Sequence, residues 1–487
     1  MQRAREKILR LTLSPTAKGG AIILSGNLLG QLIAVISTPL LTRVYDPSIL
    51  GVYGIFTSIV SVVAVISSMR YELAIALPKE DAKAASLLVV SAIASLLIAV
   101  LILILCFIFK NELIALTGLT NSAYLFLIPL SGAIIGVQQA SLQYLLRTNS
   151  YYNYAISRVF QGSSIIILQI VFGLVTGYGI FIGDSLGKVF IVLLLVYFVS
   201  KNWSRVSFQC SNLLDIAKAY SQFPKYNLPA AMLGALSINL PIIIINSHFT
   251  SAAGGHFYMA YRLLSLPVQL LSQAIGQVFL ATASRIYANG LPIDTITKDT
   301  IRNLSIAGGS LILGLNLVTR DNVSIILGEA WGPLYSYVLI MSPWFIFMLI
   351  SSPISHVMNI SGKQKQSLIF TIVEFTLRCS ILYASIMYNN IFLAAMGLSI
   401  VGSVISVSGL LMFVIAAKAS VRKVILDLLK VLLTAFSLLA LTLAFRNDSL
   451  FVNLIFSSIS LLSFLLIIKF VVFKDLNLGL YDKGGRF

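Results

Sequence analysis

The stretch Tyr258–Phe279, YMAYRLLSLPVQLLSQAIGQVF, is long and apolar enough to cross a membrane as one helix, yet it carries Arg262. An arginine in hydrocarbon costs roughly 3 kcal/mol on insertion scales, so such residues usually face a partner or a wet cavity. At about 100° per residue, Arg262 shares one helix face with small and amide residues. They are Ser265, Gln269, Ser272, Gln273, Gly276 and Gln277. The stretch therefore predicts a membrane helix with a polar side.

The composition of the whole chain agrees with a membrane protein. Of 487 residues, 58% are apolar and 10% are charged, and the mean hydropathy is +0.94. These values predict an all-α polytopic membrane protein. Apolar windows of about 20 residues, the length that spans a bilayer, recur about fourteen times. The predicted spans are 20–42, 49–69, 84–109, 122–145, 155–176, 178–200, 227–248, 256–283, 301–319, 333–359, 367–387, 391–416, 426–445 and 450–473.

The basic residues predict the orientation of these spans. If the amino terminus is cytoplasmic, 26 of the 34 Lys and Arg residues fall in cytoplasmic segments, four fall outside and four lie within spans. The positive-inside rule then places both termini in the cytoplasm. The basic start of the chain, with no small-residue cleavage site after a short apolar core, predicts an uncleaved tail rather than a signal peptide.

The longest break between spans divides the chain into two lobes. We predict an N-terminal lobe over 1–200 with six helices, a cytoplasmic amphipathic linker over 201–226, and a C-terminal lobe over 227–487 with eight. Within the linker, Leu213, Leu214, Ile216, Ala217 and Tyr220 are expected on one side of an interfacial helix. A faint repeat supports two lobes, since 45–53 resembles 249–257.

Polar residues recur on faces of several other spans. Arg158 and Gln161 share a face of the fifth span, Asn27 and Gln31 a face of the first, and Gln139 lies in the fourth. Such faces meet around a shared interior, which is either packed or a wet cavity, and both readings stay open for the amides. Asp184 with Lys188, and Glu374 with Arg378, have the i, i+4 spacing of ion pairs. Each pair either lowers the cost of insertion or binds a coupling proton or sodium ion.

Several kinds of chemistry find no motif in the sequence. No phosphate-binding loop ends in Lys-Ser or Lys-Thr, and the three histidines lack carboxylates at metal-ligand spacing, so we expect no ATP motor, metal site or other cofactor. Cys106, Cys210 and Cys379 suit neither a disulfide framework nor a metal cage. The basic residues are scattered between spans, which argues against nucleic-acid binding. Outer loops are too short for a catalytic domain, so we do not expect an enzyme.

Two regions resemble a known family. Phe223–Asn246 (FPKYNLPAAMLGALSINLPIIIIN) followed by Gly254–Phe279 (GGHFYMAYRLLSLPVQLLSQAIGQVF) resembles the start of the second lobe in bacterial polysaccharide flippases of the Wzx type, in the multidrug, oligosaccharidyl-lipid and polysaccharide (MOP) exporter superfamily. Gly26–Asp81 resembles the first two helices of the same family, including the outer TRVYDP turn and the inner RYELA exit. The resemblance implies two helix bundles around a central cavity.

The same resemblance implies a substrate and partners. The substrate would be an undecaprenyl-diphosphate-linked oligosaccharide, moved across the bacterial inner membrane, with membrane lipids around it and a polysaccharide polymerase and chain-length regulator as partners. O-antigen units of lipopolysaccharide, capsule, exopolysaccharide and teichuronic acid units fit this class alike. A multidrug exporter of the same superfamily, and a membrane glycan polymerase or ligase, are the alternatives.

We predict substrate-binding roles for residues on the polar faces. Arginine suits a diphosphate because its planar fork donates two parallel hydrogen bonds. Arg262, Arg158 and Arg70 are therefore predicted to bind the diphosphate or an acidic sugar. The amides are predicted to contact sugars, and they are Asn27, Gln31, Gln139, Gln269 and Gln273.

Overall fold

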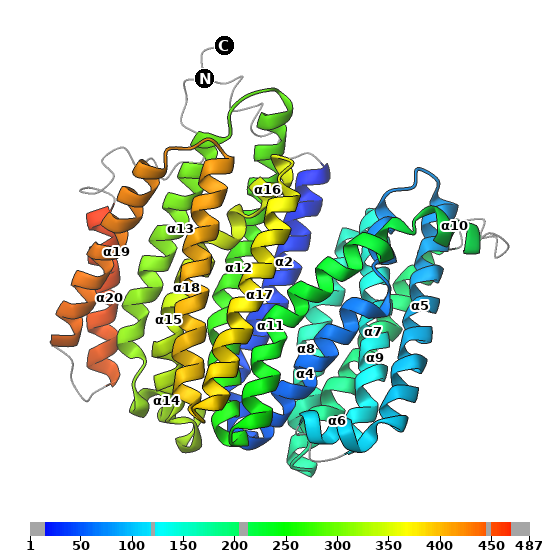
Figure 1. Cartoon of the computed structure of the whole chain (residues 1–487), viewed down its shortest axis with the longest axis horizontal. Coiled ribbons are helices and arrows are strands. Elements are labelled where there is room, and N and C mark those ends of the chain that lie inside the picture. The colour runs from blue at the N-terminus through cyan, green and yellow to red at the C-terminus, as the bar shows by residue number, and fades with distance from the viewer. Residues whose placement is uncertain (1–14, 118–121, 204–212, 445–449, 469–487) are drawn as a thin grey trace. The chain divides into compact units, whose positions relative to one another are not determined.

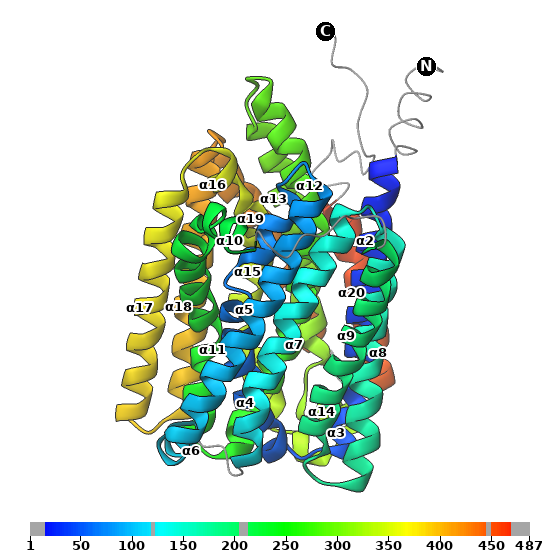
Figure 2. The same cartoon turned by 90° about the vertical axis from the view of Figure 1, so that its right-hand side faces the viewer.

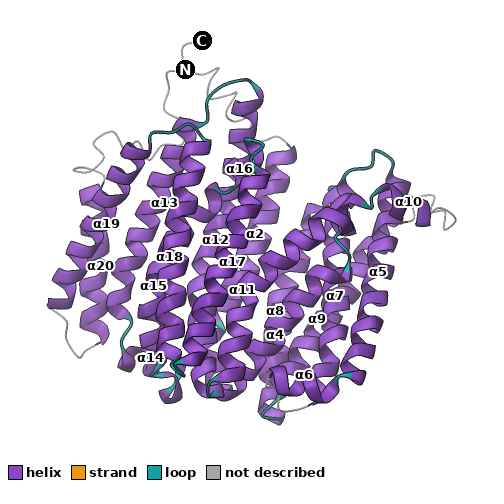
Figure 3. Ribbon diagram, viewed as in Figure 1, coloured by secondary structure: helices purple, strands orange, loops and turns teal. Residues whose placement is uncertain are grey.

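The computed structural model describes residues 15–117, 122–203, 213–444 and 450–468, and these residues form helices and no strand (Figure 3). Cys210 and the predicted amino-terminal tail up to residue 14 lie outside them. The first helices are α2 (Pro15–Ile36), α3 (Thr38–Val44), α4 (Pro47–Ser67), the 3-10 helix η1 (Tyr71–Ala76), α5 (Asp81–Ile108), α6 (Lys110–Thr117), α7 (Ser122–Arg147), α8 (Tyr151–Val175) and α9 (Gly179–Trp203).

The remaining helices continue the series of long apolar elements (Figure 1). They are α10 (Leu213–Ala219), the π-helix η3 (Phe223–Asn227), α11 (Leu228–His248), α12 (Ser251–Ala288), α13 (Asp294–Gly314), η4 (Leu315–Leu317), α14 (Arg320–Leu327), η5 (Glu329–Trp331), α15 (Leu334–Ser351), η6 (Ser352–Ile354), α16 (His356–Ile360), α17 (Gln364–Met387), α18 (Ile391–Ala416), α19 (Val421–Ala444) and α20 (Leu450–Ile467).

A helix lies over each of the fourteen predicted spans. Within the described residues, twelve helical segments are long and apolar enough to cross a membrane, which confirms a multi-pass membrane protein. The bounds predicted for the ninth span, 301–319, are wrong, because α13 begins at Asp294 and ends at Gly314. The first turns of α13 are polar, and an ion pair between Asp294 and Lys298 at i, i+4 stabilises them. The predicted fourteenth span, 450–473, extends past the described part of α20, which ends at Ile467.

The chain forms two compact units, and each has its own apolar core. The first unit comprises residues up to Leu266 with Ile326–Trp331 and Thr371–Gly397, and the second comprises the remainder. In the first, α7 contacts α4, α5, α8 and α9 (Figures 1 and 2). In the second, α13 packs against α15, α19 and α20. The first unit therefore contains α11 and the first part of α12 together with α2–α9. The predicted lobe boundary at 201–226 stays a prediction.

The described end of the linker forms the predicted short helix, α10. Leu213, Ile216 and Ala217 pack on the apolar cluster formed by η1, α5, α7 and α9. The Tyr71 hydroxyl of η1 donates to the Ala217 carbonyl at 3.1 Å, and burial raises the pKa of this phenol, which keeps the donor protonated. The placement of Leu214 on the same side is wrong, because this side chain is 77% exposed. The apolar side of α10 therefore covers protein, and Leu214 points away from it.

Candidate functional site: a basic cavity between η1, α7, α8 and α9

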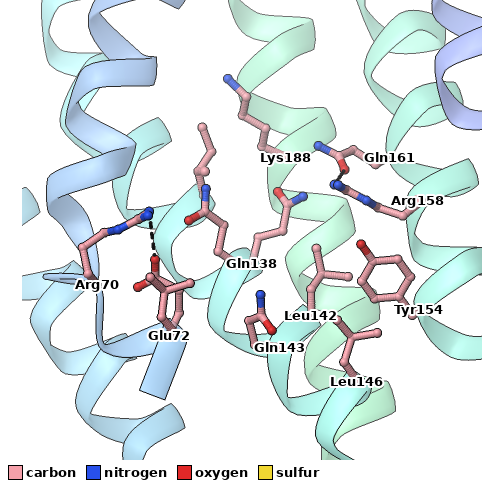
Figure 4. A pocket seen from close by; sticks show the side chains of 13 residues that line it. Arg70, Glu72, Gln138, Leu142, Gln143, Leu146, Tyr154, Arg158, Gln161 and Lys188 are labelled. Carbon is pink, nitrogen blue, oxygen red and sulfur yellow. Dashed lines mark hydrogen bonds and ion pairs between the residues drawn. The ribbon is translucent and has the colours of Figure 1, made fainter. Parts of the chain in front are cut away.

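A polar cavity of about 420 Å³ lies inside the first unit (Figure 4). Its walls come from η1 and the preceding turn, from α7, from the first half of α8 and from one side chain of α9. We call it the basic cavity, and its lining residues are Arg70, Glu72, Leu73, Ile135, Gln138, Gln139, Leu142, Gln143, Leu146, Tyr154, Arg158, Gln161 and Lys188. The lining thus contains three cationic side chains, four glutamines and one carboxylate.

Arg70 enters the basic cavity from a strained turn after α4. Met69 and Arg70 have φ values of 49° and 64°, a left-handed conformation that costs roughly 1–2 kcal/mol for an L-residue with a side chain. Arg70 Nη1 donates to Glu72 Oε1 at 3.3 Å, and the Ser68 hydroxyl donates to Glu72 Oε2. Because Glu72 is only 2% exposed, these two donors compensate the burial of its charge. The turn therefore delivers both an arginine and an acid to the cavity.

Arg158 lies on the opposite wall, on α8, and its partners are neutral. Its Nε donates to Asn27 Oδ1 at 2.9 Å, its Nη1 donates to Gln161 Oε1 at 3.1 Å, and its guanidinium lies 5.7 Å from the centre of the Tyr154 ring. No carboxylate of the described residues forms an ion pair with it. The two amide oxygens orient the Arg158 guanidinium, and because they are neutral they leave its positive charge uncompensated.

The contact between Arg158 and Asn27 requires α2 and α8 to lie very close. A Cβ on Gly162 would lie 2.6 Å from the Gly30 carbonyl oxygen, and a Cβ on Gly30 would lie 2.7 Å from the Arg158 carbonyl oxygen. Real Cβ atoms do not approach so closely, so only glycine fits at these two positions. The small residues of the two helices thereby position the amide that holds the arginine.

Lys188 connects the basic cavity to a buried polar network. Its Nζ donates to Asp184 Oδ2 one turn earlier on α9, and the Tyr53 hydroxyl donates to Asp184 Oδ1 at 3.1 Å. Gln169 Nε2 donates to the Tyr53 hydroxyl at 2.9 Å. All four residues are buried. The predicted Asp184–Lys188 ion pair is therefore present, and it belongs to a network across α4, α8 and α9.

In Figure 4, Gln138 and Gln143 of α7 lie between the two arginines. Gln138, Gln139 and Gln143 all line the cavity. The Gln138 side chain is 4% exposed, and its Oε1 is buried without a hydrogen-bond partner in the described residues. An amide donates two hydrogen bonds and accepts at its oxygen, which suits the hydroxyls of sugars.

The structure brings some of the predicted residues together. Arg70, Arg158, Gln139 and Lys188 line the basic cavity, and Asn27 contacts Arg158. Gln31 follows Asn27 by one turn on α2, and its Oε1 is buried without a hydrogen-bond partner in the described part of the chain.

Other predicted residues do not reach the cavity. Arg262, Gln269 and Gln273 lie on α12, and none of them lines it. Arg262 interacts electrostatically with the Tyr53 hydroxyl, whereas Gln269 and Gln273 belong to the second unit and are exposed. The predicted Glu374–Arg378 ion pair is present on α17, also away from this cavity.

Glu72, Gln138 and Tyr53 are the residues that sequence reasoning missed. Glu72 lies two residues after Arg70, beyond the apolar span, where an acid is expected to meet water. Its signal was the RYELA stretch itself, in which an acid follows the arginine closely. Gln138 and Tyr53 carry no such signal, because one amide and one tyrosine in apolar helices are most often packing residues.

The arrangement suits an anion with hydroxyl groups. Lys188 is compensated by Asp184 and Arg70 by Glu72, so Arg158 carries the uncompensated positive charge of the cavity. An anion that binds there has no ion pair to break, and the neighbouring amides can accept or donate hydrogen bonds. No group of three or more metal-ligating side chains occurs among the described residues.

Comparisons with known proteins identify a family and a fold. A family model described as "Polysaccharide biosynthesis protein" matches residues 40–336. No curated protein matches the chain by sequence. Among solved structures, the chain is similar to the lipid II flippase MurJ in an inward closed conformation, with 15% identity and a TM-score of 0.64 over 96% of this chain and 99% of that one.

Two further structures share this architecture. An inward-facing multidrug resistance MATE family transporter of the MOP superfamily matches with 16% identity and a TM-score of 0.62, over 82% of this chain and 99% of that one. A MOP superfamily transporter from Pyrococcus furiosus, described by the reverse polarity of its binding pocket, matches with 15% identity and a TM-score of 0.57, over 83% and 96%. At such identities the likeness establishes the fold, which is that of MOP superfamily transporters.

Proposed function

Because the chain belongs to the family of polysaccharide biosynthesis proteins and has the fold of MOP superfamily transporters, we propose that it is a lipid-linked oligosaccharide flippase of the Wzx type. It would carry undecaprenyl-diphosphate-linked repeat units from the cytoplasmic to the outer leaflet of the bacterial inner membrane. The similarity to a protein named as a lipid II flippase supports a lipid-linked substrate. The chain would act as a transporter without catalysis, and a polymerase would consume its product.

The observation that carries this proposal is the pairing of Arg158 with neutral amides in the basic cavity. A guanidinium held by Asn27 and Gln161 keeps its charge for a ligand. Charge-assisted hydrogen bonds to phosphate are roughly twice as strong as neutral ones. The side-chain amides of the surrounding glutamines would form hydrogen bonds with the hydroxyls of the first sugars after the diphosphate. We therefore assign the diphosphate or an acidic sugar to Arg158, with Arg70 exchanging its bond to Glu72 for one to the ligand.

This cavity also bears on the alternative of a multidrug exporter. A cationic drug in the basic cavity would meet three cations, and the one lining acid is already engaged by Arg70 and Ser68. Like charges at close range in a low-dielectric site are unfavourable. The cavity thus favours an anionic substrate over a cationic drug.

We further propose that transport is coupled to a proton or sodium ion. Asp184 and Glu374 are the candidates within the spans, and Asp184 is the one whose network reaches the basic cavity through Lys188. Neutralising Asp184 should remove the dependence of transport on the ion gradient. Transport that follows the gradient unchanged in Asp184→Asn would exclude this residue as the coupling group.

Deletion of the gene followed by lipid analysis tests the proposed function. We expect lipid-linked repeat units to accumulate on the cytoplasmic face and the surface polymer to be lost. The intact chain should restore the polymer, and Arg158→Gln should not restore it at equal abundance in the membrane. An intact surface polymer in the deletion strain, with no accumulated lipid-linked intermediate, would exclude the function.

A further inference from the structure

A proline inside α11 leaves one buried carbonyl without its usual helical donor. Pro241 has no amide hydrogen, so the carbonyl of Ser237, four residues earlier, cannot form the regular i to i+4 bond. Ser237 is 4% exposed, so water does not compensate readily. A buried carbonyl without a partner destabilises a protein, and such groups are almost always paired.

A charged side chain from another helix reaches this carbonyl. Arg378 Nη1 of α17 donates to the Ser237 carbonyl oxygen at 3.0 Å, and Arg378 Nη2 donates to Glu374 Oε1 on the same helix. Arg378 is 5% exposed, so its charge is buried with the bond. This hydrogen bond joins α17 to α11, both labelled in Figures 1 and 2.

The other prolines inside long helices show that this contact is specific. Pro129, Pro267 and Pro343 interrupt α7, α12 and α15. The carbonyls four residues before them belong to Leu125, Leu263 and Leu339. None of these accepts a hydrogen bond from a side chain of the described residues. The bond at Ser237 is therefore not a general consequence of helix prolines in this chain.

We propose that Arg378 replaces the missing amide donor at position 241 and that Glu374 holds the guanidinium in place, so that α17 clamps α11 at its proline. The clamp gives the two charges within α17 a defined role in positioning α11. Because α11 also packs against α4, which carries Tyr53, the clamp supports the helix next to the buried network.

A double-mutant cycle tests the clamp without reference to any substrate. Every variant that lacks Arg378 also carries Glu374→Gln, and every variant that keeps Arg378 keeps Glu374, so that neither buried charge is left without its partner. Arg378→Met then removes the donor to Ser237 and keeps an apolar side chain of similar length. In the presence of Pro241 we expect the midpoint of thermal unfolding in detergent to fall by several degrees. With Pro241→Ala, the new amide takes the Ser237 carbonyl, and the same substitution should lower the midpoint by less than half as much.

The matched control repeats the cycle with Pro129→Ala, which lies in the same unit and far from Arg378 in sequence. Its effect should add to that of Arg378→Met without coupling. Should Arg378→Met fail to reach the membrane, recovery of its abundance by Pro241→Ala and not by Pro129→Ala would support the clamp. An equal loss with and without Pro241, in midpoint or in abundance, would overturn it. Since no transport is measured, either outcome is independent of the proposed function.

Discussion

At the scale of single residues, Arg158 should matter most because its charge is uncompensated. Arg158→Gln removes a charged donor to phosphate, a change typically worth about 1.5–3 kcal/mol, so binding of undecaprenyl diphosphate should weaken by about ten- to a hundredfold. Arg158→Lys keeps the charge but lacks the planar fork that bonds phosphate in a bidentate manner, so intermediate binding is expected. Native mass spectrometry of the purified protein measures both. Arg422→Gln, at an exposed arginine of α19, is the control. Equal binding by Arg158→Gln and Arg422→Gln would contradict the assignment.

The buried pair on α9 leads to a prediction about stability. Asp184→Asn leaves the Lys188 ammonium without its carboxylate, and breaking a buried ion pair on one side costs roughly 3–5 kcal/mol. The double variant Asp184→Asn with Lys188→Met removes both charges and should regain much of the lost stability. Thermal unfolding in detergent compares the unchanged protein, Asp184→Asn, Lys188→Met and the double variant. Additive losses in the double variant would show that the two charges do not depend on each other.

At the scale of elements, the close approach of α2 and α8 should control Arg158 indirectly. Gly162→Val places side-chain atoms where the Gly30 carbonyl lies, so the helices must separate, at a cost of about 1–3 kcal/mol. The separation should also withdraw Asn27 from Arg158 and weaken diphosphate binding. Gly20→Ala is the matched control, because a Cβ at this position of α2 meets nothing within 4 Å. A Gly162→Val protein with the stability and binding of the Gly20→Ala protein would refute the role of this contact.

At the scale of the whole molecule, the distribution of basic residues predicts the orientation in the membrane. In a cysteine-free background, Gly177→Cys lies in a predicted outer loop and Lys79→Cys in a predicted cytoplasmic segment, and both positions are open. A membrane-impermeant thiol reagent added to spheroplasts should label the first and spare the second until the membrane is lysed. The reverse pattern would invert the topology and, with it, the face on which the basic cavity receives its ligand.

Most of the fold was predictable because membrane spans depend on hydropathy along the chain. The positions of the helices followed from the lengths of the apolar stretches. The main error was in α13, whose first turns are polar and carry the Asp294–Lys298 ion pair, so the helix begins before the apolar stretch by which it was predicted. The site was only partly predictable. Helical spacing identified the polar faces of α2 and α8, but it could not show that Arg158 turns toward Asn27 or that Glu72 is buried. Such contacts depend on how helices approach each other, which at Gly30 and Gly162 is decided by tertiary packing.

The left-handed turn at Met69 and Arg70 sets stability against activity. Glycine adopts this conformation without strain and asparagine at little cost, so in a Glu72→Gln background, where no buried carboxylate needs Arg70, Arg70→Gly or Arg70→Asn should relax the backbone while removing a cation from the cavity. A directed-evolution screen that rewards only heat resistance should therefore select these substitutions, and a screen for surface polymer should reject them. If the same substitution at position 70 is enriched under the first selection and depleted under the second, natural selection has kept an unfavourable backbone conformation there because the arginine side chain is needed.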